Sequence, residues 1–344
     1  LVDIVRLYIR MKEGGRYTRA AFLHEAARTI PGVYVPSLYR VTYHEDGTVE
    51  AYMPVYDDIP KRVKKQIIQD MDKAFFPEKL VMPYIDTVHD RIVLEPARGC
   101  IRGCRFCQAG MVYRPVREKT PEVLDAQARA LYASTGYEEV SLCCLSISDY
   151  TKVDELTDRL LTWTDPNMVS LSLPSLRVDS FTKELMEKVA SVRASSITFA
   201  PEAGTQRMRD VINKNVVEAD LMRAVNVAFD AGKNQIKLYF MQGLPTETHE
   251  DLKGIADLAH RVVEAFYANS NHVKRAPLVT ISVSPFIPKP FTPFQWEAQD
   301  DLDTMLAKQE YVGECVTDRK VRYTHHDGEI CRIEAVFARG DRKL

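Results

Sequence analysis

Three of the chain's seven cysteines, Cys100, Cys104 and Cys107, lie close together at the spacing Cys-x3-Cys-x2-Cys. If this segment is a loop, its three thiolates can converge on one point. Three thiolates match three irons of a [4Fe–4S] cube and leave the fourth iron open to another ligand. A closed zinc site usually takes four ligands, and no fourth Cys or His follows at finger-like spacing. A zinc knuckle and an electron-transfer cluster stay open as alternatives.

The neighbours of these cysteines also suit a cluster. Gly99 and Gly103 allow the backbone to turn tightly beside it. Arg98, Arg102 and Arg105 would offset the negative charge of the cluster and its thiolates. An odd number of cysteines gives no disulfide framework, which fits a reducing compartment and predicts a cytoplasmic location.

The elements that must position this loop are strands and helices in alternation. From residue 91 onward, six apolar and β-branched runs with little strict alternation predict buried parallel strands. Six βα units in series predict an α/β fold, a partial (β/α)6 TIM-like barrel whose active site lies at the carboxyl ends of the strands. The predicted strands lie within RIVLEPA, EEVSLCCL, MVSLSLPSL, SSITFAPE, NQIKLYFM and PLVTISVSPF.

Shorter segments flank the predicted barrel of residues 91–296. Residues 1–90 predict a small α+β appendage with two helices and a hairpin at Asp46-Gly47. Residues 297–344 predict a short extension with a helix and a strand. Because the chain starts without Met and within a helical pattern, we interpret it as a fragment of a longer protein.

The composition and the missing motifs limit the kinds of function that this chain can have. A net charge of -2 gives no bulk attraction to nucleic acid, so the charge does not support a nucleic-acid partner. No run approaches the roughly 20 apolar residues of a membrane span, and no signal peptide is visible. The absence of Walker, G-x-G-x-x-G and G-x-S-x-G motifs removes support for kinases, dinucleotide reductases and hydrolases.

The cysteine loop, with Phe106 before its last cysteine, resembles the radical S-adenosylmethionine (SAM) superfamily. The resemblance implies an enzyme in which Cys100, Cys104 and Cys107 hold a [4Fe–4S] cube and SAM chelates the open iron. Reduction then cleaves SAM to methionine and a 5′-deoxyadenosyl radical, which abstracts a substrate hydrogen. It also implies an external one-electron reductant such as flavodoxin or ferredoxin.

The same resemblance implies SAM contacts at the ends of the second and third strands. Ser148 and Asp149 stand where the family presents polar groups to the SAM amino group. Ser175 and Arg177 would face the same mouth, where the arginine could pair with the SAM carboxylate. The alternatives are that Asp149 caps the following helix and that Arg177 pairs with Asp179 on the surface.

Further contacts are implied at the next two strand ends. Glu202, with Arg207 nearby, would reach the ribose or the network that binds the SAM carboxylate. Gly243 and Pro245 would shape a loop near adenine. The segment 284–296, rich in proline and aromatic residues, would form a rigid wall across the barrel mouth.

Lys237 interrupts an otherwise buried strand and is the one candidate for a catalytic side chain. Buried lysines are rare unless they are paired. We therefore expect a structural ion pair with Glu95 or Glu202. A proton donor or a substrate contact is the alternative.

Longer segments, such as RGCIRGCRFCQAGMVYRPVRE and FAPEAGTQRMRDVINK, look like a bacterial group of B12-binding radical SAM proteins. That resemblance implies a preceding cobalamin domain and cobalamin-assisted methyl transfer or rearrangement at carbon, although this chain has no D-x-H-x-x-G motif. One alternative is an RNA-modifying enzyme like the methylthiotransferases, which usually carry three further cysteines; none precede Cys100 here. Another is a non-catalytic iron–sulfur protein.

Overall fold

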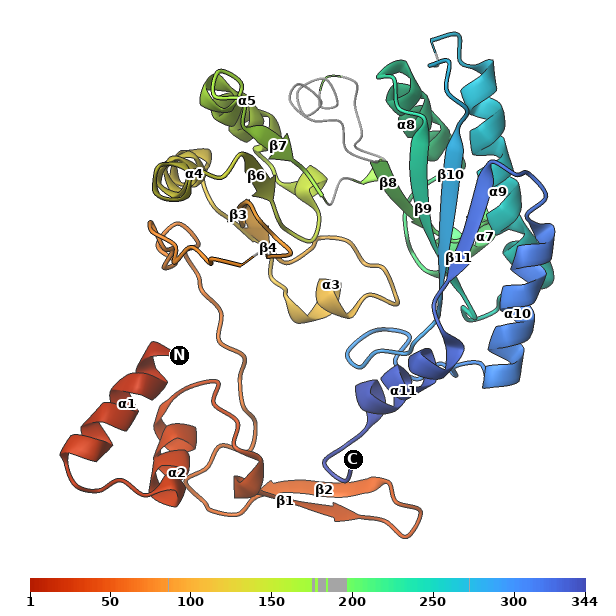
Figure 1. Ribbon diagram of the computed structural model, residues 1–344. Coiled ribbons are helices and arrows are strands. Elements are labelled where there is room, and N and C mark those ends of the chain that lie inside the picture. The colour runs from red at the N-terminus through yellow and green to blue at the C-terminus, as the bar shows by residue number, and fades with distance from the viewer. Residues whose placement is uncertain (86, 175–176, 179–183, 185–196, 272) are drawn as a thin grey trace. The chain divides into compact units, whose positions relative to one another are not determined.

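The computed structural model describes residues 1–85, 87–174, 177–178, 184, 197–271 and 273–344. By their internal contacts these residues divide into two compact units, Leu1–Gln69 and Asp70–Leu344. Each unit is described by itself below (Figure 1).

The first unit pairs two helices with a hairpin. The Thr18 hydroxyl accepts a hydrogen bond from the Ala21 amide (3.1 Å) and so caps the second helix. The two strands are antiparallel around the predicted Asp46-Gly47 turn, where Gly47 has a φ of +84°. The predicted hairpin is therefore confirmed. The elements are α1 (Val2–Glu13), α2 (Arg19–Thr29), η1 (Pro36–Leu38), β1 (Tyr39–Tyr43) and β2 (Val49–Pro54).

The second unit contains two sheets in which every strand pairs in parallel. Their orders are β3-β6-β7 and β11-β10-β9-β8. The six predicted strands are all present, which confirms a mixed α/β fold with parallel sheets. A seventh strand, β11, extends the second sheet beyond β10. The strands are β3 (Ile92–Leu94), β6 (Glu139–Leu142), β7 (Ser170–Ser172), β8 (Ile197–Glu202), β9 (Gln235–Gln242), β10 (Leu278–Pro285) and β11 (Val321–His325).

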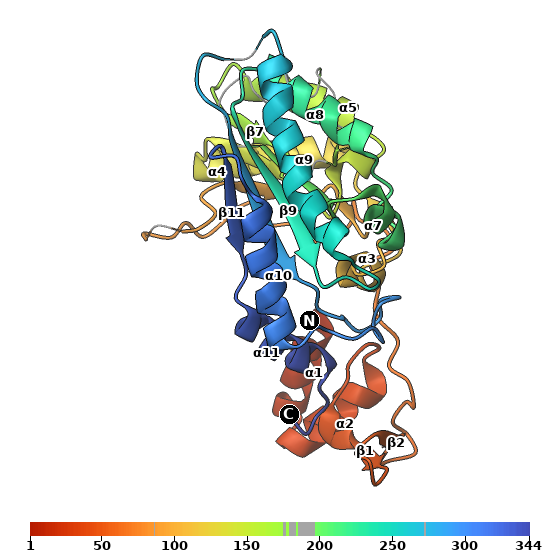
Figure 2. The same cartoon turned by 90° about the vertical axis from the view of Figure 1, so that its right-hand side faces the viewer.

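Helices cover one face of each sheet. In β9 the alternate residues Ile236, Leu238 and Phe240 are buried in a core shared with α8 (Glu218–Asp230) and α9 (His249–Ala268). Figure 2 shows α8, α9 and α10 lying over this sheet. Burying each such side chain contributes about 1.5–3 kcal/mol. The alternate residues of β9 on the opposite face are half-buried or exposed.

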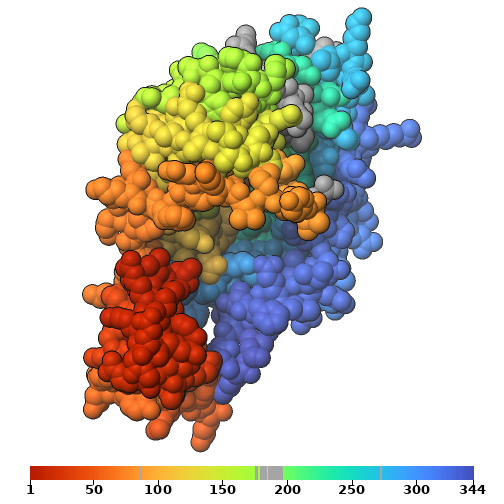
Figure 3. All heavy atoms as spheres, turned by 60° about the vertical axis from the view of Figure 1, so that its left-hand side comes forward, coloured from red at the N-terminus to blue at the C-terminus, as the bar shows by residue number. Residues whose placement is uncertain are grey.

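The first sheet is covered in the same way by α4 (Pro121–Thr135) and α5 (Val153–Thr164). The yellow and light-green atoms of these helices form a continuous outer surface in Figure 3. Pro121 begins α4, and Gly136, at a φ of +70°, ends it. The other elements of this unit are β4 (Ala97–Arg98), α3 (Gln108–Val112), β5 (Arg117–Glu118), η2 (Ile147–Asp149), α7 (Gln206–Val211), α10 (Leu302–Cys315) and α11 (Gly328–Arg339).

Candidate functional site

The three cysteines lie on the loop that follows β3 and β4 and leads into α3. All three are free thiols; Cys104 is buried, and Cys100 and Cys107 are half-buried. The Cys107 sulfur accepts a hydrogen bond from the Gly110 amide at the start of α3 (3.4 Å). The Cys100 sulfur accepts one from the Arg102 amide (3.4 Å). Backbone amides of the loop and of α3 therefore orient these two sulfurs.

Segments that follow the strands of the second sheet hold this loop in place. The Arg105 amide donates to the Ile212 carbonyl (2.9 Å), and the Asn213 side chain donates to the Gly103 carbonyl (2.9 Å). The Phe294 amide donates to the Arg105 carbonyl (3.2 Å). The loop is thus fixed from two sides at the carboxyl ends of β8 and β10.

Phe106 anchors the same loop through apolar contact. It packs against a buried cluster made by the segments after β8, β9 and β10, including Met208, Leu244 and Phe286. Phe286 contacts Phe294 edge-on, with the ring centroids 5.9 Å apart. The predicted wall of residues 284–296 therefore supports the cysteine loop from its apolar side.

The loop needs the two predicted glycines for different reasons. Gly99 has a φ of +97°, and a Cβ there would lie 2.8 Å from two backbone carbonyl oxygens. Gly103 has an ordinary φ, but its Cβ would lie 2.9 Å from the Asn213 amide nitrogen. The first is required by backbone conformation and the second by the contact that holds the loop.

Asp149, at the end of η2, faces the cysteine loop. Its carboxylate accepts two hydrogen bonds from the Arg102 guanidinium, at 2.9 and 2.5 Å. Burial raises the pKa of Asp149, but hydrogen bonds from Arg102 and Ser146 and the charges of Arg102 and Arg177 together outweigh it, so the pKa lies below its ordinary value. The capping alternative is wrong, because Lys152 is the N-cap of α5.

Ser148 and Arg177 are brought together beside this pair. The Ser148 hydroxyl accepts a hydrogen bond from the Arg177 amide (2.9 Å), and the Arg177 guanidinium donates to the Lys214 carbonyl (3.3 Å). Ser175 lies outside the described residues, as does Asp179, the alternative partner of Arg177. The ends of the second and third strands therefore meet near the cysteine loop.

Glu202 ends β8 with a φ of +67°, in the left-handed region that few non-glycine residues adopt. Its carboxylate pairs with the Lys214 ammonium at 3.1 Å, and only 18% and 12% of the two side chains are exposed. Burial raises the pKa of the Cys104 thiol, while the nearby cations Lys214 and Arg177 oppose that rise. The sequence analysis missed Lys214, although a lysine so near the predicted Glu202 was a usable signal.

Arg207, expected near Glu202, contacts the turn after β9 and the start of α9. Its guanidinium pairs with Asp251 at the start of α9 and donates to the Thr246 carbonyl (2.9 Å). Asp251 in turn accepts from the amide and hydroxyl of Thr248, which caps α9. Arg207 therefore ties α7 to the turn that follows β9.

That turn contains the predicted Gly243 and Pro245, and a buried ion pair stabilises it. The Gly243 amide donates to the Glu247 carboxylate (2.8 Å), which pairs with Lys308 at 3.1 Å. Burial raises the pKa of Glu247, and Lys308 opposes the rise. Pro245 is half-buried in the same turn, next to Leu244 of the apolar cluster.

The two ion pairs expected for Lys237 are wrong. Glu95 pairs with Arg98 (2.6 Å), and Glu202 pairs with Lys214. The Lys237 ammonium lies over the ring of Tyr239 instead, 4.7 Å from its centroid. Because Arg98 pairs with Glu95, it is not the free cation beside the cysteines that the sequence suggested.

The other two arginines of the loop are engaged as well. Arg102 pairs with Asp149, and the Arg105 guanidinium donates to the carbonyls of Asp210 and Val211. Their charges position the loop through these partners, and Arg177 and Lys214 are the cations that act on Cys104.

The three thiols fit a [4Fe–4S] cluster by their chemistry and accessibility. Among the described residues, no three His, Cys, Asp or Glu side chains lie close enough to share a single metal ion. A cube places each thiolate on a different iron, so its ligands stand further apart than those of one ion. The three sulfurs are free and lie on one loop, and Lys214 and Arg177 are cations near the buried Cys104.

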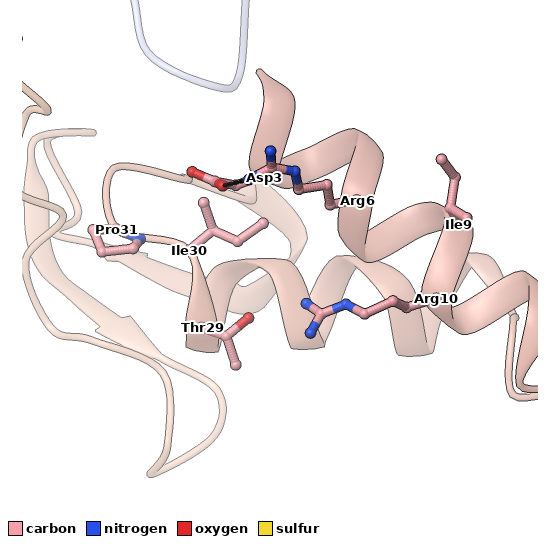
Figure 4. A pocket seen from close by; sticks show the side chains of 7 residues that line it. All are labelled: Asp3, Arg6, Ile9, Arg10, Thr29, Ile30 and Pro31. Carbon is pink, nitrogen blue, oxygen red and sulfur yellow. Dashed lines mark ion pairs between the residues drawn. The ribbon is translucent and has the colours of Figure 1, made fainter.

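A separate hollow of about 600 Å³ lies between α1 and α2 of the first unit. Figure 4 shows Arg10 extending from α1 toward α2, and Asp3 pairs with Arg6 at 4.0 Å. None of the residues selected from the sequence lines this hollow. Its lining consists of Asp3, Arg6, Ile9, Arg10, Thr29, Ile30 and Pro31.

A comparison with protein families identifies a domain in this chain. The family described as the radical SAM superfamily matches residues 94–259, from β3 through most of α9. Residues 94–259 form a radical SAM domain. The match spans the cysteine loop, the ends of β6 to β9 and the predicted SAM-binding positions.

Curated relatives of this chain come from Methanocaldococcus jannaschii. "Uncharacterized protein MJ0966" is 33% identical over 298 residues, 83% of this chain and 62% of the relative. "Putative methylthiotransferase MJ0865" is 23% identical over 169 residues, 46% of this chain and 37% of the relative. The chain thus spans less than two thirds of the length of these relatives.

Solved structures with similarity to this chain include two enzymes. The cobalamin-dependent SAM radical enzyme OxsB is 12% identical, with a TM-score of 0.48 over 97% of this chain and 50% of that chain. The radical SAM methyltransferase TsrM from Kitasatospora setae is 13% identical, with a TM-score of 0.46 over 63% of this chain and 39% of that chain. Within the described residues, no helix combines the length and apolar character needed to traverse a membrane.

One prediction concerns the Asp149–Arg102 pair. Asp149→Asn is expected to lower the free energy of unfolding by about 2 kcal/mol at pH 7, because hydrogen bonds between charged partners contribute roughly 1.5–3 kcal/mol. Folding lowers the pKa of Asp149, so this stabilisation is complete above the ordinary pKa near 4 and is lost as the pH falls toward the folded value. Urea titrations at pH 7, 5 and 3.5 measure the effect.

The matched control for this pair is Asp154→Asn, an exposed carboxylate in the first turn of α5. It should change stability by only a few tenths of a kcal/mol. The difference between wild type and Asp149→Asn should stay constant between pH 7 and 5 and shrink below about pH 4. A difference independent of pH would mean that the charge of Asp149 contributes nothing.

Proposed function

We propose that this protein binds a [4Fe–4S] cluster through Cys100, Cys104 and Cys107 and binds SAM at the open iron. When bound, the cluster supplies the electron that cleaves SAM to methionine and a 5′-deoxyadenosyl radical. The observation that carries the proposal is the set of three free cysteines on one loop, fixed at the carboxyl ends of the strands. The electron comes from an external reductant such as flavodoxin or ferredoxin in the cytoplasm.

The chain's own residues bind and orient SAM in this proposal. Ser148 and Asp149 serve the amino group, and Asp149 also positions the loop through Arg102. Arg177, placed beside Ser148, serves the carboxylate together with Ser175.

The remaining contacts lie across the mouth, on the second sheet. Glu202 accepts from the ribose hydroxyls while Lys214 holds its carboxylate. Gly243 and Pro245 form the adenine side of the pocket, and Arg207 fixes their turn through the Thr246 carbonyl. The apolar cluster beneath Phe106 excludes water from this side of the loop.

The reaction that follows is proposed to be cobalamin-assisted methyl transfer or rearrangement at an unactivated carbon. Its support is the likeness of segments such as FAPEAGTQRMRDVINK to the B12-binding group of radical SAM proteins. Methylthio transfer to RNA is the second candidate, supported by the similarity to a putative methylthiotransferase. That route usually employs a second cluster, and the 344 residues hold only four further cysteines, all after Cys107.

Anaerobic reconstitution with iron and sulfide tests the proposal. We expect a dark chromophore, about four irons per chain and, after reduction, release of 5′-deoxyadenosine and methionine from SAM. About eight irons per chain would instead favour the methylthiotransferase route. Zinc bound without an iron chromophore would contradict both.

A further inference from the structure

The inner face of the second sheet, which the helices do not cover, is polar. Strand register places Thr198, Lys237, Thr280 and Arg322 side by side across β8, β9, β10 and β11. The preceding residue on each strand belongs to the apolar core beneath the helices. Because side chains alternate along a strand, these four side chains emerge on the opposite, inner face.

This row carries positive charge that no carboxylate of the described residues pairs with. All residues of the four strands are described, and their only acidic residue is Glu202, which pairs with Lys214. Among the described residues, neither Lys237 nor Arg322 forms an ion pair. Lys237 is half-buried, and the ring of Tyr239 is its recorded partner, at 4.7 Å. Arg322 is exposed, so both cations are accessible to an anionic ligand.

Hydroxyl groups surround the two cations on the same face. Thr198 and Thr280 flank Lys237, and Thr280 lies between Lys237 and Arg322. One row further along the strands, register places Tyr239 beside Ser282. An ammonium, a guanidinium fork and several hydroxyl donors are the groups that proteins use to bind carboxylate and phosphate oxygens.

We propose that this inner face binds an oxyanion, a carboxylate or a phosphate, carried by the substrate, between Lys237 and Arg322 and over Thr280. The proposal rests on the proposed function and adds the substrate class to it. Lys237 and Arg322 stand two strands apart, about 10 Å, which their long side chains can bridge to one oxyanion. Neither ammonium nor guanidinium changes its covalent state in this role.

The position of the row also sets the length of the substrate. Gln242, at the end of β9, is the fifth residue after Lys237, which corresponds to about 17 Å along the strand. The cysteine loop lies at the strand ends. The substrate in this proposal is therefore elongated, with its anionic group on the inner face of the sheet and its reacting carbon near the cysteine loop.

The test observes the Lys237 ammonium directly and needs neither cluster nor SAM. Lysines of the chain are dimethylated with ¹³C-formaldehyde, and the Lys237 signal is assigned by its loss in Lys237→Arg. Methyl phosphate and propionate are then titrated separately at constant ionic strength. We expect one of them to shift the Lys237 signal saturably, and the one that does so identifies a phosphate or a carboxylate substrate.

Variants decide whether the site is built as proposed. Arg322→Gln is expected to raise the dissociation constant roughly tenfold, and Lys253→Met, on an exposed pair of α9, should leave it unchanged. No shift with either anion, or equal unsaturable shifts of all lysines, would overturn the proposal. An unchanged affinity in Arg322→Gln would overturn the role of Arg322. SAM cleavage is independent of each of these outcomes, so the proposed function fails or survives separately.

Discussion

Cys104→Ala is expected to abolish the iron chromophore and to reduce SAM cleavage to background. Cys104 is the buried member of the three cysteines and the one that Lys214 and Arg177 act on. Without its thiolate a cube would have two protein ligands, too few to fix its position on the loop. Iron content and 5′-deoxyadenosine release after anaerobic reconstitution measure the effect.

The control for this substitution is Cys315→Ala, a half-buried free cysteine in α10. It should retain iron and cleavage at the wild-type level. Since Cys104 is buried, the urea midpoint of Cys104→Ala is measured as well, and a folded chain without iron separates ligand loss from misfolding. Wild-type iron content in Cys104→Ala would show that these cysteines are not the ligands.

Gly204→Ala is expected to lower the free energy of unfolding by about 3 kcal/mol, at the upper end of overpacking effects. A Cβ at Gly204 would lie 2.2 Å from the Ile255 nitrogen and 2.4 Å from the Gly254 carbonyl carbon. These are backbone atoms of α9, whose inner side is buried along much of its length. The loop after Glu202 must therefore move, and urea unfolding measures the consequence.

Gly313→Ala is the matched control for this steric effect. Its Cβ would make an ordinary contact, 3.5 Å from the Tyr323 ring, within α10. Alanine favours a helix over glycine by up to about 1 kcal/mol, so this variant should be slightly more stable than wild type. If Gly204→Ala were as stable as wild type, the close approach of the β8 loop to α9 would not constrain the fold.

The local elements could be predicted because their signals are short-range. Apolar β-branched runs indicated all six barrel strands, and Asp46-Gly47 indicated the hairpin. The pattern could not show how the strands divide between two sheets, or that β11 would extend the second one. Those features depend on contacts between segments far apart in the chain.

The ion pairs of the site show the same limit. Asp149 was the alternative cap of α5, but it pairs with Arg102 of the cysteine loop, and Lys152 is the N-cap. Lys237 was expected to pair with Glu95 or Glu202, but both carboxylates have other cations. A charged side chain can pair with any opposite charge within reach, and reach is defined only once the strands are packed.

The sequence by itself determined the chemistry available to this protein: three cysteines at a spacing that suits one cluster, placed after the first of six parallel strands. Spacing and periodicity are local properties, and the chain displays them before it folds. The tertiary structure decided which charges act on that chemistry. It placed Lys214 and Arg177 beside Cys104, and it gave Lys237 and Arg322 no ion-pair partner among the described residues. Electrostatic interactions depend on distance and burial, and packing between remote segments sets both.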